Sequence, residues 1–137
     1  MIGHVAFVTD RMEETIRFYR DMFGYRHGFS LSDAEGNPWI EYLAGPDGDF
    51  IELFYAPAGV SVTAGSAYSH ICIEISDIRN VIADADRLGI PLYKPLKEGL
   101  DRNLQAWFLD PNGLKVEVMQ MSPDSPQSAI RQSLRTS

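Results

Sequence analysis

The sequence repeats itself with an offset of about 65 residues, and this repeat constrains the fold more than any other feature. Four features share the offset to within one residue: the turn Pro46-Asp47-Gly48 recurs as Pro111-Asn112-Gly113, Glu52 as Glu117, Gly24 as Gly89, and His4 as His70. The repeat predicts two copies of one module within a single domain of residues 1–137. Module one spans residues 1–55, a linker covers 56–68, module two spans 69–121, and a C-terminal tail covers 122–137.

Each copy has the pattern of a strand, a helix and three further strands. In the first copy, strands are predicted over 2–9, 25–33, 38–44 and 49–55, and a helix begins at the capping box Asp10 and Glu13 and ends at Gly24. In the second, strands are predicted over 69–76, 91–96, 103–110 and 115–121, and a helix runs from its cap Asp77 to Gly89. The polar tail is predicted to be short. The fold class is therefore α+β.

The net charge, the apolar runs and the cysteine content limit which partners and which cellular location are expected. The net charge is −7 and the isoelectric point is near 4.8, which excludes a broad surface for nucleic acid or anionic membrane. No apolar run approaches the roughly 20 residues of a membrane span, and the N-terminus lacks the pattern of a signal peptide. Cys72 is the only cysteine, so no internal disulfide can form and a cytoplasmic location is expected.

Strand alternation places the repeated histidines and glutamates away from the face that packs on a helix. In the strand of 69–76, His70 shares a face with Cys72 and Glu74, opposite three isoleucines. Glu52 and Glu117 lie opposite the apolar residues of their own strands in the same way. The first strand is ambiguous, because Ala6 and Val8 share the face of His4. A carboxylate in such a strand is costly unless it is paired or binds a metal.

Two imidazoles and two carboxylates placed by an internal repeat are typical of a metal site. The alternative is that all four are ordinary solvent-facing polar residues. Nitrogen and oxygen donors suit nickel, cobalt, zinc, manganese or ferrous iron. Four protein ligands would leave two positions of an octahedral ion for a substrate, which is a catalytic arrangement.

At these residues the sequence resembles the vicinal oxygen chelate superfamily and, within it, the glyoxalase I (lactoylglutathione lyase) family. The resemblance covers residues 2–121 and is carried by three segments: Phe50-Ile51-Glu52-Leu53, Gly65-Ser66-Ala67-Tyr68-Ser69-His70-Ile71, and Asp110 to Glu117. It implies paired βαβββ modules that form a cup-shaped, mostly antiparallel sheet. It also implies one divalent metal per site, with nickel or zinc favoured and cobalt, manganese or iron possible, and the ligand order His4, Glu52, His70 and Glu117.

The resemblance implies a metal-dependent lyase or isomerase that acts by enediolate chemistry on a small molecule with vicinal oxygens. Glu117 is the predicted base and Glu52 the predicted group that returns the proton. The resemblance further implies a homodimer whose sites are shared between chains. Alternatives within the superfamily are a metal-dependent epimerase or sugar isomerase and an extradiol-type dioxygenase. A different class is a non-catalytic module that binds small molecules and confers resistance.

The sequence departs from the enzymes of this family that use glutathione. Val8 stands where they carry an arginine, four residues after the first ligand, and Ala56 stands where they carry an asparagine. We therefore expect poor use of the glutathione adduct. Lys97 and Arg102 are alternative sources of positive charge near the site, and Cys72 is predicted to be a small buried thiol.

Overall fold

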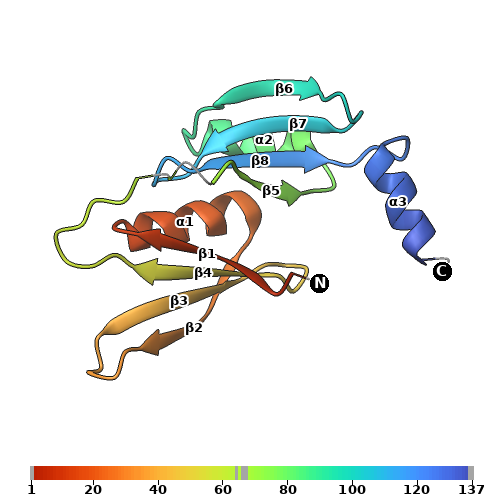
Figure 1. The fold of residues 1–137 in the computed structure, drawn as a ribbon. Coiled ribbons are helices and arrows are strands. Elements are labelled where there is room, and N and C mark those ends of the chain that lie inside the picture. Colours follow the sequence, from red (N-terminus) through yellow and green to blue (C-terminus); the bar gives the residue numbers. More distant parts are fainter. Residues whose placement is uncertain (1, 64, 66–67, 136–137) are drawn as a thin grey trace. The chain divides into compact units, whose positions relative to one another are not determined.

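The computed structural model describes residues 2–63, 65 and 68–135 of the 137. Residues 64, 66 and 67 of the predicted linker, and residues 1, 136 and 137, lie outside the described residues. The chain divides into two compact units (Figure 1). The first comprises Met1–Gly65 and Asp110–Gly113, and the second comprises Ser66–Leu109 and Leu114–Ser137.

The first unit contains a four-stranded mixed sheet with the order β1-β4-β3-β2. β1 (His4–Thr9) pairs in parallel with β4 (Phe50–Tyr55). β3 (Pro38–Ala44) pairs antiparallel with β4 and with β2 (Arg26–Ser32). Helix α1 (Met12–Phe23) lies over one face of this sheet (Figure 1).

The second unit repeats this arrangement with the order β5-β8-β7-β6. β5 (Ile71–Glu74) is parallel to β8 (Lys115–Gln120), while β7 (Leu104–Leu109) is antiparallel to β8 and to β6 (Lys94–Glu98). Helix α2 (Ile78–Arg87) contacts β7 and β8. The predicted α+β fold with two βαβββ modules is confirmed, although β5 is shorter and β6 begins later than the pattern indicated.

The core of the first unit lies between α1 and the sheet. Tyr19 is fully buried there, and its ring stacks on Phe7 of β1 at 6.4 Å between centroids. The Tyr19 hydroxyl donates a hydrogen bond to Asp110 Oδ2 at 3.2 Å, so the Asp110–Gly113 loop packs with this unit. The helix ends at Gly24, whose φ of 73° is the left-handed conformation that its position in the repeat predicted.

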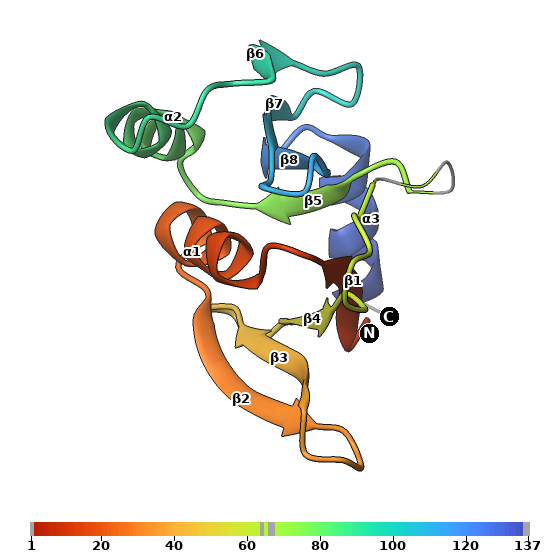
Figure 2. The ribbon, with the colours of Figure 1, turned by 90° about the vertical axis from the view of Figure 1, so that its left-hand side faces the viewer.

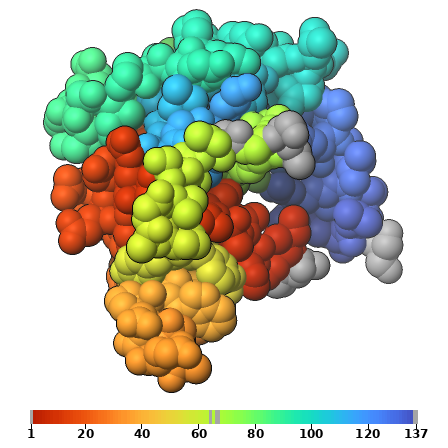
Figure 3. Space-filling view, turned by 60° about the vertical axis from the view of Figure 1, so that its left-hand side comes forward, coloured from red at the N-terminus to blue at the C-terminus, as the bar shows by residue number. Residues whose placement is uncertain are grey.

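The hairpin of β2 and β3 extends from the rest of the first unit (Figures 2 and 3). All seven residues of β2 are exposed, whereas Ile40 and Leu43 of β3 are buried. Tyr42 of β3 stacks on Phe29 of β2 with a centroid distance of 4.2 Å. This aromatic pair therefore stiffens the hairpin on the face opposite α1.

The two helices begin differently. Asp77 caps α2 as predicted, because its Oδ1 accepts hydrogen bonds from the backbone N–H groups of Arg79 and Asn80. The capping box predicted for α1 is wrong. The N-cap residue is Arg11, it makes no side-chain cap, and Asp10 instead accepts a hydrogen bond from the N–H of Val62.

We expect Asp77→Ala to lower the free energy of unfolding by about 1 kcal/mol, because two backbone donors at the start of α2 lose their acceptor. Asp10→Ala is the matched control, since Asp10 caps no helix, and a change of no more than about 0.5 kcal/mol is expected. Urea unfolding of the two variants measures the difference. Equal destabilisation by both variants would contradict the assignment of the caps.

The tail forms a helix, α3 (Pro126–Arg135), which the sequence analysis did not anticipate. Arg131 donates two hydrogen bonds to the Glu74 carboxylate, at 3.0 and 2.9 Å, and Gln127 accepts one from the buried side chain of Asn103. Ile130 and Leu134 remain exposed. Polar contacts with the second unit, rather than apolar burial, therefore hold α3.

Candidate metal centre

In the first unit, His4 and Glu52 come together on the sheet face opposite α1. Their strands pair so that Glu52 lies beside Ala6, and His4 stands two residues before Ala6 on the same face. His4 Nε2 is 3.4 Å from Glu52 Oε2. The Glu52 side chain is 9% exposed and that of His4 is 51% exposed. A nearly buried carboxylate therefore faces a more accessible imidazole.

The exposure of the β1 residues shows which face of this strand carries His4. Phe7 and Thr9 are buried on the helix side, whereas Ala6 and Val8 are exposed together with His4. Val8 is therefore on the face of the His4–Glu52 pair, four residues along the strand.

The second unit repeats the pair with His70 and Glu117. Glu117 lies beside Cys72, and His70 stands two residues before Cys72. His70 Nε2 is 3.1 Å from Glu117 Oε2, with side-chain exposures of 33% and 12%. The Ser69 hydroxyl meets His70 Nδ1 at 2.9 Å, so Nε2 is the nitrogen left to face the carboxylate.

The two nitrogen–oxygen distances, 3.4 Å and 3.1 Å, match the distance between two ligands of the same metal ion. With metal–ligand bonds of about 2.1 Å, two donors lie about 3.0 Å apart in an octahedral arrangement and about 3.4 Å apart in a tetrahedral one. Imidazole nitrogen with carboxylate oxygen is also a donor set that divalent transition metals accept. Within the described residues, no group of three or more His, Cys, Asp or Glu side chains is gathered closely enough to hold an ion. Each pair supplies two donors, so a four-ligand centre requires both pairs.

Cys72 and Glu74 share the strand face of His70, and the structure shows the surroundings of each. Cys72 is exposed, so its prediction as a buried thiol is wrong. Loss of hydration around its sulfur, and then the Glu117 carboxylate, raise the pKa of Cys72 to about 12, so it stays a neutral thiol at pH 7. Glu74 is paired with Arg131 and therefore fastens α3.

Three cations of the second unit lie in or next to the strands β6 and β7: Lys94, Lys97 and Arg102. Lys97 pairs with Gln105 in the β6–β7 ladder, and Arg102 occupies a tight turn with φ of 67°. Lys94 lies opposite Trp107, with its Nζ 4.8 Å from the centre of the Trp107 ring, and that ring meets His70 edge to face at 4.7 Å. The sequence analysis did not name Lys94.

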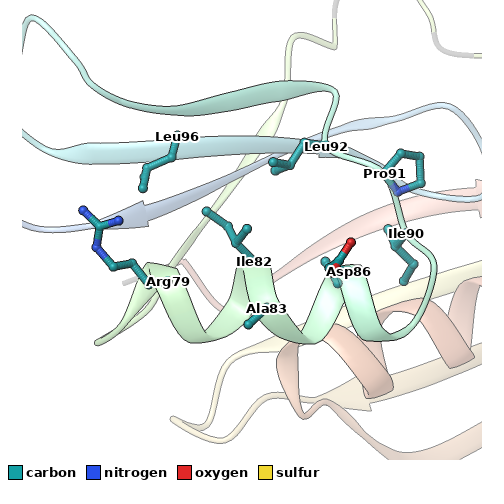
Figure 4. A pocket seen from close by; sticks show the side chains of 9 residues that line it. Arg79, Ile82, Ala83, Asp86, Ile90, Pro91, Leu92 and Leu96 are labelled. Atoms are coloured by element: carbon teal, nitrogen blue, oxygen red, sulfur yellow. The ribbon is translucent and has the colours of Figure 1, made fainter.

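An apolar pocket of about 490 Å³ lies elsewhere, between α2 and β6 (Figure 4). Its lining includes Ile82, Leu92 and Leu96, with Arg79 and Asp86 among them. Helix α2 buries Ile78 and Ala85, whereas α1 buries large aromatic rings. The lining of the pocket contains no histidine or cysteine.

Sequence comparison identifies the family to which the chain belongs. A sequence profile of the Glyoxalase/Bleomycin resistance protein/Dioxygenase superfamily matches residues 1–118. The chain belongs to this superfamily. No helix among the described residues is long and apolar enough to cross a membrane.

Three individual proteins are similar to the chain, at sequence identities between 15% and 27%. The lactoylglutathione lyase of Haemophilus influenzae is 27% identical over 125 residues, which cover 87% of this chain and 91% of the relative. The trypanothione-dependent glyoxalase I of Leishmania major has a TM-score of 0.73 at 20% identity, covering 99% of this chain and 94% of that one. The fosfomycin resistance protein FosX of Listeria monocytogenes, in complex with Mn(II) and sulfate, has a TM-score of 0.69 at 15% identity, covering 93% and 97%. The structural likenesses establish the fold.

Proposed function

We propose that the chain is a divalent-metal-dependent lyase or isomerase of the glyoxalase I type, acting on a small molecule with neighbouring oxygen atoms. The observation that carries this proposal is the repeated His–Glu pair, found at the same register in both units with donor separations of 3.4 and 3.1 Å. Superfamily membership and the lactoylglutathione lyase relative support it.

His4, Glu52, His70 and Glu117 would hold the ion. When bound, a divalent ion supplies Lewis acidity that makes a C–H group beside a carbonyl easier to deprotonate. Glu117 removes that proton, since its carboxylate already stands at the site. Glu52 belongs to the other pair and would return the proton. Nickel or zinc is the favoured ion, and cobalt, manganese and iron are the alternatives.

Each unit supplies one histidine and one glutamate, so the two pairs must meet to complete the site. The linker of residues 56–68 has 13 positions and can span up to about 43 Å. This length permits the pairs to meet either within a chain or between chains. We favour a two-fold homodimer in which His4 and Glu52 of one chain join His70 and Glu117 of its partner, as the resemblance implies.

Metal analysis and a substrate panel test the proposed function. Purified protein should bind one divalent ion per chain, and a chelator should abolish turnover. The panel contains the glutathione–methylglyoxal adduct, hydroxy-ketones and sugar phosphates, each assayed with nickel, zinc, cobalt and manganese. Absence of tight metal binding, with small-molecule binding unaffected by chelator, would instead indicate a non-catalytic binding module.

We expect the glutathione adduct to be a poor substrate, because Val8 and Ala56 provide no charge-assisted contact for its anionic ends. Each missing contact corresponds to about 1.5–3 kcal/mol of binding, which is roughly a tenfold or larger increase in KM. Val8→Arg should therefore lower KM for the adduct, whereas Val8→Leu, the matched control, should not. Efficient turnover by the unaltered protein at low micromolar adduct would contradict this prediction.

A further inference from the structure

Tyr42 contacts the first His–Glu pair from the neighbouring strand. It lies directly opposite Glu52 in the β3–β4 ladder, and its hydroxyl donates a hydrogen bond to Glu52 Oε1. The other carboxylate oxygen, Oε2, faces His4 Nε2. The two oxygens of Glu52 therefore have separate partners, one a phenol and the other the imidazole.

The Tyr42 ring is itself held in place. It stacks on Phe29 at 4.2 Å and meets the rings of His4 and Phe50 edge to face, at 6.4 and 6.5 Å. A hydroxyl on a ring packed in this way cannot follow a moving carboxylate far. The hydrogen bond therefore restrains Glu52.

Trp107 occupies the same position in the second unit, 65 residues after Tyr42 and directly opposite Glu117. Its ring packs on His70, but its indole N–H donates to Gln105 Oε1 at 3.0 Å rather than to Glu117. Cys72, the residue beside Glu117, offers that carboxylate a hydrogen bond from its thiol, and a thiol is a weaker donor than a phenol. Among the described residues, Glu117 has no hydroxyl donor that corresponds to that of Tyr42.

We infer that Tyr42 is a positioning residue that restrains Glu52 as a stationary metal ligand, while the indole at position 107 leaves Glu117 free to move between metal and substrate. This inference rests on the proposed function and deepens it. The internal repeat gives the two glutamates equivalent positions, and the aromatic residue opposite each one makes their behaviour different. Outer partners of this kind set both the orientation and the affinity of a ligand.

Removing the hydroxyl at position 42 and adding one at position 107 tests the inference. Metal binding is measured by calorimetric titration of Ni²⁺ alone into metal-free protein. Tyr42→Phe should weaken Ni²⁺ binding about tenfold, with kcat at saturating metal changed far less. Phe29→Leu removes the ring stack that holds Tyr42 and keeps the hydroxyl, so it should weaken Ni²⁺ binding less than Tyr42→Phe does.

The converse change is made in the second unit. Trp107→Tyr places a phenol opposite Glu117, and Trp107→Phe is its matched control, which differs by that hydroxyl alone. We expect Trp107→Tyr to bind Ni²⁺ more tightly than Trp107→Phe and to have a kcat about tenfold lower, because Glu117 is now restrained.

Distinct results separate this inference from the proposed function. If the unaltered protein binds no divalent metal, both are wrong. If it binds Ni²⁺ and Tyr42→Phe binds it equally well, the inference is wrong and the proposed function stands. Identical affinity and kcat in Trp107→Tyr and Trp107→Phe would likewise overturn the mobility assigned to Glu117.

Discussion

Replacing Glu117 by glutamine is expected to lower kcat by about 10²- to 10⁴-fold while much of the bound metal is retained. The amide keeps an oxygen that can face His70 and the ion, but it cannot accept a proton from the substrate. Steady-state kinetics and metal analysis of the same preparation measure the two effects together. Full activity in Glu117→Gln would show that another group is the base.

Two further variants show whether the loss of activity in Glu117→Gln is specific to the role of Glu117 as the base. His70→Ala removes a proposed ligand outright, so it should release the metal, a larger loss than the about 10- to 100-fold caused by removing an outer hydrogen-bond partner. Glu74→Gln is the matched control for charge, because Glu74 is a carboxylate of the neighbouring strand β5 that is paired with Arg131. Its kcat should stay close to that of the unaltered protein.

Mixing two inactive variants is expected to restore activity if the sites are shared between chains. A His4→Ala chain and a Glu117→Gln chain are unfolded together and refolded. Random pairing makes half of the dimers mixed, and each mixed dimer has one intact site of its two. The mixture should therefore recover about a quarter of the activity of unaltered protein treated in the same way.

Each variant refolded alone serves as the control and should stay inactive. Sites confined to single chains would leave every combination inactive, because each chain would carry its own defect into its own site. That result would replace the shared-site homodimer by a chain whose two modules complete one site. It would leave the ligand assignment unchanged.

The sequence alone was enough to predict the repeated βαβββ arrangement. Apolar spacing of 3.6 residues separated the helices from the strands, whose side chains alternate with period two, and Gly24 marked the end of α1. Such signals are local, because the residues that carry them are close along the chain. The same periodicity predicted that Glu52 and Glu117 face away from the helices. That prediction needed no knowledge of which strands are neighbours.

The structure alone decided the contacts that depend on pairing between distant segments. The hydroxyl of Tyr42 meets Glu52 because β3 and β4 pair in one particular register, which no local pattern specifies. The polar tail forms α3, whose Arg131 pairs with Glu74, 57 residues away along the chain. Asp10 fails as a cap although its spacing from Glu13 is right, because its carboxylate binds the N–H of Val62 instead. Local periodicity therefore determined the elements and their faces, whereas long-range register determined which polar groups meet, since a hydrogen bond forms only where tertiary packing brings donor and acceptor within about 3 Å.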